Sequence, residues 1–174
     1  MSYETTTQNT SELNEFEKPK LSTTLNVLTI LTFIGCALQL VGAIWQFMTA
    51  QKNYDEKDTM LAKMTSEDMP AFAKSMMGDP KEYEMMVTKS LENKIPIFII
   101  GLLSAGLCFY GAMQMRKLYK QGYLIYVIGE LLPFVSLLFF LGAFAMKGMG
   151  FYIATAITLL FLILYTSQRK KLIY

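Results

Sequence analysis

The fold is decided by residues 123–145, which read YLIYVIGELLPFVSLLFFLGAFA. A run of about 20 apolar residues is long enough for a helix to cross a lipid bilayer. One acid, Glu130, interrupts this run three residues before Pro133. Proline has no backbone N–H, so the carbonyl of Gly129 loses its helical donor. The most costly side chain for a membrane and the most irregular backbone fall together, which makes Glu130 and Pro133 a candidate intramembrane site.

The composition of the whole chain is typical of a membrane protein. Hydrophobic residues make up 53% of the 174 residues, and 17% are charged. A net charge of +2 without a basic, aromatic-rich cluster argues against nucleic acid as a partner. The sequence contains no histidine, which removes histidine-based nucleophile pairs, zinc sites and acid–base catalysis. Cys36 and Cys108 lie in apolar runs, where buried side chains are expected rather than a disulfide.

Four apolar stretches predict an all-α fold, a polytopic bundle of four transmembrane helices. We expect the spans at residues 25–48, 95–115, 123–145 and 151–167. Residues 1–20 are polar and predict a disordered cytoplasmic tail rather than a cleaved signal peptide. Residues 21–174 then form one membrane domain in contact with the lipid bilayer.

Small side chains predict where the spans pack closely, because glycine, alanine and serine let a neighbouring helix approach. Residues four or seven apart share one helix face. Such sets are Gly35 and Gly42 in the first span, Gly101 and Ala105 in the second, and Gly129, Ser136 and Ala143 in the third. These glycine seams are candidate surfaces for a homo-oligomer. Gln39, deep in the first span, is expected to hydrogen-bond to a neighbouring helix.

Residues 51–94 form the one substantial polar segment and are predicted to be helical, with a first helix ending near Gly78. Asp79-Pro80 with Glu82 is a helix start signal: an N-cap, a proline at the first position and an acid three residues after the cap. An apolar helix face then follows and is the candidate interaction face: Tyr83, Met86, Val87 and Leu91. The bundle mouth, the bilayer surface or a protein partner must cover this face.

Methionines are frequent in the same segment, and thioethers are suitable ligands for Cu(I). Their spacing is not repeated, and no histidine or cysteine accompanies them: Met60, Met64, Met69, Met76, Met77, Met85 and Met86. Methionine also fills apolar contact surfaces, which is the interpretation we prefer. No metal and no cofactor is therefore expected.

The orientation depends on the basic residues. Four spans place both termini on one side, and the 16 lysines and arginines divide equally between the two sides. The bases at residues 116–120 and 169–171 lie in short stretches without acids, whereas those of residues 51–94 are mixed with acids. Dense bases near span ends favour the cytoplasm. We expect cytoplasmic termini and an extracytoplasmic segment 51–94.

The surroundings of Glu130 follow from its depth. Glu130 lies seven residues into its span, or about 10 Å at 1.5 Å per residue. The hydrogen-bond partners expected at this depth are Tyr110, Tyr126, Thr29 and Thr32. Arg116 or Lys117 could supply a counter-charge by reaching inward. Gln39 is expected to lie too far toward the outer side to pair with the acid.

Two stretches resemble a functionally uncharacterised family of small four-span membrane proteins from Bacteroidota-type bacteria. They are residues 18–35, KPKLSTTLNVLTILTFIG, and residues 122–133, GYLIYVIGELLP. The resemblance covers the membrane portion and is weak in residues 51–94. It implies a bacterial cytoplasmic (inner) membrane, and neither an activity nor a functional residue comes with it.

Two functions remain open. The first is a non-enzymatic structural or accessory bundle that contacts a protein partner through residues 51–94 or the glycine seams. The alternative is a small transporter or proton-coupled carrier that uses Glu130 at the Pro133 break. An enzyme ranks last, because the spans contain no paired acids, metal-ligand spacing or nucleophile with a base.

Overall fold

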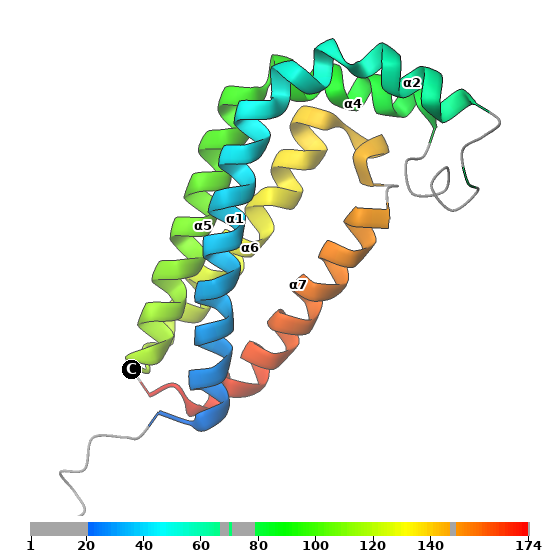
Figure 1. The fold of residues 1–174 in the computed structure, drawn as a ribbon. Coiled ribbons are helices and arrows are strands. Elements are labelled where there is room, and N and C mark those ends of the chain that lie inside the picture. The colour runs from blue at the N-terminus through cyan, green and yellow to red at the C-terminus, as the bar shows by residue number, and fades with distance from the viewer. Residues whose placement is uncertain (1–20, 67–69, 71–78, 147–148, 174) are drawn as a thin grey trace, which may run out of the picture.

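The computed structural model describes residues 21–66, 70, 79–146 and 149–173. This part of the chain is all-α, with four helices long and apolar enough to cross a membrane (Figure 1). They are α1 (Thr23–Asp55), α5 (Lys94–Arg116), α6 (Gln121–Ser136) with its continuation η2 (Leu137–Leu141), and α7 (Met149–Gln168). The predicted fold class is confirmed: the chain is a multi-pass membrane protein in contact with lipid. The tail at 1–20 lies outside the described residues.

Two shorter helices extend sideways from the bundle at the end opposite the termini. The helix α2 (Lys57–Thr65) follows α1 after Glu56, and α4 (Pro80–Glu92) is joined to α5 through Asn93. The two helices run side by side away from the bundle axis (Figure 1). The predicted start of α4 is confirmed, since the Asp79 side chain accepts a hydrogen bond from the backbone N–H of Lys81 at 2.8 Å. The predicted helix end at Gly78 lies outside the described residues.

The closest packing joins α5 and α6. A Cβ atom added at Gly111 would lie 2.6 Å from the backbone nitrogen of Tyr126, and one at Gly129 would lie 2.8 Å from that of Cys108. Gly122 is equally crowded, with Gly111 O at 2.7 Å. Gly122, Gly129 and Ser136 are buried and stand seven residues apart, so they form the actual seam of α6.

The predicted glycine face of α1 is not used in the same way. Nothing lies within 4 Å of a Cβ built at Gly35 or Gly42, so no helix of the described residues packs closely on either glycine, and Gly42 lines a cavity between α1, α5 and α6. A Cβ added at Gly101 would lie 3.5 Å from the Cβ of Ala43 in α1, an ordinary contact, and Ala105 is buried. Close approach therefore occurs where a glycine of one helix faces the backbone of another, which spacing within one helix does not reveal.

The third span is shorter and less regular than residues 123–145 predict. Its α-helix ends at Ser136 and continues as the π-helical turn η2, in which the N–H of Gly142 donates to the carbonyl of Leu137 at 3.1 Å. Gly142 has a φ of 98°, a left-handed conformation that stops the span. Ala143 then begins the 3₁₀ helix η3 (Ala143–Met146), so it lies outside the small-residue seam.

The last span, α7, is anchored at its C-terminal end. The Tyr165 hydroxyl lies 2.7 Å from Thr32 Oγ1, and its ring packs 4.6 Å from that of Tyr126. Ser22 donates to the Gln168 side chain at 3.2 Å. Toward its N-terminal end α7 diverges from α1 and α6 (Figure 1). Only 6% of its most apolar stretch is buried, against 22–28% in the other three spans.

Candidate functional site

The carbonyl freed by Pro133 finds a new donor on the neighbouring helix. Ser104 of α5 is fully buried, and its hydroxyl donates to the Gly129 carbonyl at 2.8 Å. The same hydroxyl oxygen accepts a hydrogen bond from Gln39 Nε2 of α1 at 2.8 Å. A short hydrogen-bonded chain thus joins α1, α5 and α6 at the helix break, with Gln39 in the interhelical role predicted for it.

Glu130 lies next to this chain and is half-buried. Its Oε1 accepts a hydrogen bond from Thr158 of α7 at 3.3 Å, and its Oε2 accepts one from the thiol of Cys108 of α5 at 3.4 Å. No described lysine or arginine lies within ion-pair distance of the carboxylate. A membrane-embedded acid without a basic partner usually marks a functional site.

The structure does not bring together all the residues predicted around Glu130. Tyr110 is half-exposed, and its hydroxyl accepts a hydrogen bond from Gln114 at 2.6 Å. Tyr126 is buried against the ring of Tyr165, and within the described residues it makes no hydrogen bond to Glu130. On α5, Cys108 makes the hydrogen bond to Glu130 that was predicted for Tyr110. Because Tyr110 is two residues from Cys108, it points to a different side of α5.

The other predicted partners also bond elsewhere. The Thr29 hydroxyl donates to the backbone carbonyl of Asn26 at 2.9 Å, and Thr32 pairs with Tyr165. Arg116 lies over the ring of Phe33, 5.9 Å from its centroid. These predictions of contact with Glu130 were wrong, because sequence depth ignores which face of each helix points inward.

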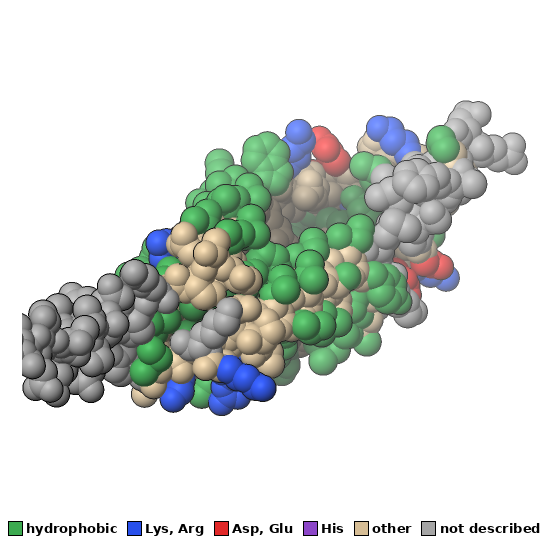
Figure 2. Space-filling view, turned by 90° about the horizontal axis from the view of Figure 1, so that it is seen from below, with side chains coloured by type: hydrophobic (Ala, Val, Ile, Leu, Met, Phe, Trp, Pro, Cys, Tyr) green, Lys and Arg blue, Asp and Glu red, His purple; other side chains and the backbone are tan. Residues whose placement is uncertain are grey.

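A cleft surrounds Glu130. It has a volume of about 340 Å³ and is lined by polar and aromatic side chains that include Gln39, Glu130, Phe134, Phe151 and Thr158. Pro133 and Leu137 lie in its wall, so the part of the third span where the α-helix gives way to the π-helical turn faces the cleft. The space-filling view shows a hollow between walls of apolar side chains (Figure 2). Gln39 does not bond to Glu130, but both side chains line this one cleft.

A second cavity of about 400 Å³ lies nearer to the bundle mouth, which is the end of the bundle next to α4. Its lining includes Gln46, Ser90, Lys94 and Phe98, and it shares Gln39, Pro133 and Leu137 with the first cavity. The Lys94 ammonium group also lies 5.8 Å from the centroid of the Phe47 ring. Because they share three lining residues, the two cavities adjoin each other between α4 and Glu130.

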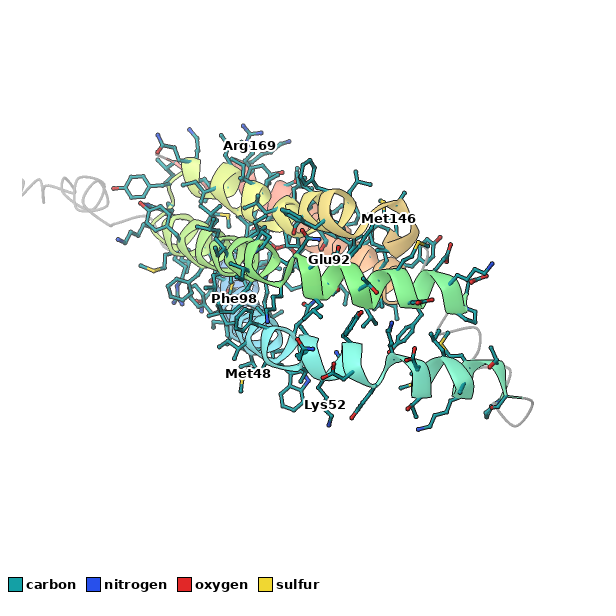
Figure 3. The ribbon with its side chains drawn as sticks, turned by 90° about the horizontal axis from the view of Figure 1, so that it is seen from above. Met48, Lys52, Glu92, Phe98, Met146 and Arg169 are labelled. Carbon is teal, nitrogen blue, oxygen red and sulfur yellow. The ribbon has the colours of Figure 1, made fainter. Side chains whose placement is uncertain are left out.

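The candidate interaction face of α4 lies against the chain itself. Val87 is buried, and the remaining three residues are half-buried: Tyr83, Met86 and Leu91. Seen from the bundle mouth, α4 lies between α2 on one side and η3, with Met146, on the other (Figure 3). Of the coverings that the sequence leaves open, the bundle mouth is the one seen here.

The described residues contain no group of three or more histidine, cysteine, aspartate or glutamate side chains able to hold a metal ion. No family model, curated protein or solved structure matches the chain. The family resemblance of residues 18–35 and 122–133 therefore stays an expectation, whereas the four apolar helices are present.

Proposed function

We propose that the protein is a small, non-enzymatic membrane carrier, coupled to protons through Glu130. The observation that carries the proposal is the position of this carboxylate. It lacks a described basic partner, lines a cleft beside Pro133, and contacts the middle of α7 through Thr158. The α-helix of α6 runs through Pro133 and gives way to the π-helical turn at Leu137. Interrupted helices at buried ionisable groups are typical of transport sites.

The one-sided anchoring of α7 supplies the movement that a carrier needs. The C-terminal end of α7 is held by several hydrogen bonds, and its middle by the hydrogen bond of Thr158 to Glu130. Near its N-terminal end the described contacts include the rings of Phe151 and Phe134, 5.8 Å apart. A helix fixed at one end can rock as a rigid body and change which side reaches the cleft. Protonation of Glu130 would remove the charge that favours water in the cleft. The apolar side chains of α6 and α7 that line the cleft could then approach each other.

The proposed location is a bacterial cytoplasmic membrane with both termini in the cytoplasm. The described residues at the termini end include five basic side chains and no acid: Arg116, Lys117, Lys120, Arg169 and Lys170. Blue side chains gather near this end in the space-filling view (Figure 2). This distribution agrees with the enrichment of bases on the cytoplasmic side.

The orientation gives a direct prediction. A cysteine placed at exposed Lys63 in α2 should react with a membrane-impermeant maleimide added outside intact cells. A cysteine at Lys170 should react only after the membrane is opened. The reverse pattern would place the termini outside.

The carrier proposal predicts two-sided access to the cleft. Ala154 of α7 lines it and is exposed, so an Ala154→Cys variant tests the site. Labelling by an impermeant maleimide should occur in both right-side-out and inside-out vesicles, since the cleft opens to each side in turn. Glu130→Gln keeps a hydrogen-bond acceptor for Thr158, so it should fold, but without the titratable acid it should favour labelling from one side.

Ala156→Cys is the matched control. It lies on the same helix, is exposed and does not line the cleft, so lipid should keep it unreactive from both sides. If Ala154→Cys reacts from one side only, with the same rate in the Glu130→Gln background, the carrier proposal is wrong.

A second candidate is the accessory or oligomeric bundle. It is favoured by Gly35 of α1, which is exposed and has no close neighbour, and by the small buried share of α7, either of which a second helix could cover. Native mass spectrometry of gently extracted protein separates the two. A co-purifying protein at fixed stoichiometry would favour the accessory bundle, and a partner-free species would favour the carrier.

A further inference from the structure

We infer that the ligand of the Glu130 cleft is a lipophilic cation, that is, an ammonium or phosphonium group bearing apolar substituents. The inference rests on the proposed function for the site and adds its substrate class. It follows from the charge, the lining and the hydrogen-bonding capacity of the cleft.

The charge of the cleft selects a cation. Glu130 is the one acid among the described lining residues, and no described lining residue is basic. Thr158 and Cys108 donate hydrogen bonds to the carboxylate but leave its charge uncompensated. A like charge on a ligand would be repelled in this low-dielectric setting, whereas a positive charge would complete the site.

The lining selects an apolar body around that charge. Phe134 and Phe151 both line the cleft, with ring planes at 79° to each other, so a ligand between the helices meets aromatic faces and edges. Aromatic faces attract organic cations. The adjoining cavity adds Phe98 and Phe47, but Lys94 also lines that cavity and lies over the Phe47 ring, so the positive charge of the ligand is expected beside Glu130 and not there.

The hydrogen-bonding capacity excludes other ligand classes. Besides Glu130, the polar side chains of the cleft are Gln39 and Thr158, and Gln39 already donates to Ser104. A sugar or an amino acid would need more hydrogen-bond partners than these. Magnesium and calcium require several oxygen ligands, and one carboxylate with two neutral groups does not supply them. An organic cation binds water weakly, so it loses less hydration free energy than these ligands when it enters the cleft.

The other ionisable side chains near Glu130 are two thiols and two phenols. On the neighbouring helices they are Cys36 of α1, Cys108 of α5 and Tyr165 of α7, and Tyr126 lies on the same helix. Thiols and phenols are uncharged at neutral pH. The negative charge that selects a cation therefore comes from the one carboxylate of Glu130.

The experiment uses tetraphenylphosphonium and tetraphenylborate, which have the same shape and opposite charge. Calorimetric titration of the purified full chain in neutral detergent should show saturable binding of the phosphonium and none of the borate. Glu130→Gln should weaken phosphonium binding at least tenfold. Glu92→Gln removes the same charge from exposed α4, away from the cleft, and should bind as the parent protein does.

Equal binding of both ions, or unchanged phosphonium binding by folded Glu130→Gln, would overturn the inference. If Glu130→Gln does not fold, the parent protein still decides: saturable binding of the phosphonium without the borate supports the inference, and binding of the borate as tight as that of the phosphonium contradicts it. The outcomes are separable from the carrier proposal. Phosphonium binding with one-sided Ala154→Cys labelling would make the protein a receptor for such cations, and two-sided labelling without phosphonium binding would leave a carrier for another substrate.

Discussion

Gly111→Ala is expected to destabilise the folded bundle by roughly 1–3 kcal/mol, the typical cost of overpacking. The added methyl group would lie 2.6 Å from the backbone nitrogen of Tyr126 and 2.8 Å from the carbonyl oxygen of Gly122. Backbone atoms cannot turn aside as a flexible side chain can, so α5 and α6 must separate. The separation would also loosen the Ser104 and Cys108 contacts with α6. Unfolding by sodium dodecyl sulfate, followed by far-ultraviolet circular dichroism, measures the loss.

Gly106→Ala is the matched control on the same helix. Gly106 is exposed, and nothing lies within 4 Å of its added Cβ. Alanine favours a helix over glycine by about 0.5–1 kcal/mol, so this variant should be unchanged or slightly more stable. Equal stability of the two variants would show that α5 and α6 are not packed backbone to backbone.

Ser104→Ala is expected to destabilise the protein by roughly 1–2 kcal/mol, because it leaves a buried carbonyl without a donor. The carbonyl of Gly129 has lost its helical partner to Pro133 and accepts from Ser104 instead. The variant also removes the acceptor of Gln39. The same unfolding experiment measures the change.

A double-mutant cycle with Pro133→Ala tests whether Ser104→Ala destabilises the protein because the Gly129 carbonyl loses its donor. Alanine at 133 restores the backbone N–H, so the Gly129 carbonyl regains a donor within α6. Ser104→Ala should then cost less in the Pro133→Ala background than in the parent, with a coupling of up to about 1.7 kcal/mol, the largest value typical of membrane hydrogen bonds. Additive effects would mean that Ser104 and the proline break act independently.

The sequence predicts the main elements well, because each rests on local physics. Apolar length defines the four spans, and the Asp79-Pro80 cap defines the start of α4. The sequence also predicts the irregularity at Pro133 and the interhelical role of Gln39. The donor for the freed carbonyl was missed, although a signal existed: Ser104 is the only serine or threonine of its span.

Other features depend on the rotational setting of the helices, which a single sequence does not record. Tyr110 and Cys108 lie at similar depth, but Cys108 points to Glu130 and Tyr110 points outward. The seven-residue spacing of Gly35 and Gly42 resembles that of Gly122 and Gly129, yet only the second pair meets another helix. The third span ends at Leu141 because Gly142 adopts a left-handed conformation. Apolar content alone would extend this span to residue 145.

The anchoring of α7 at one end has a consequence for the order of assembly. Its fixed end contacts residues from the beginning of the chain, through Ser22 with Gln168 and Thr32 with Tyr165, separated by 146 and 133 positions. Such distant pairs form only after the last span has left the ribosome. The hairpin of α5 and α6, joined by a short turn, forms earlier in synthesis. The contacts between the two ends of the chain therefore form after α5 and α6 have paired. A chain shortened before Tyr165 should insert its first three spans but leave the N-terminal end of α1 without its partner.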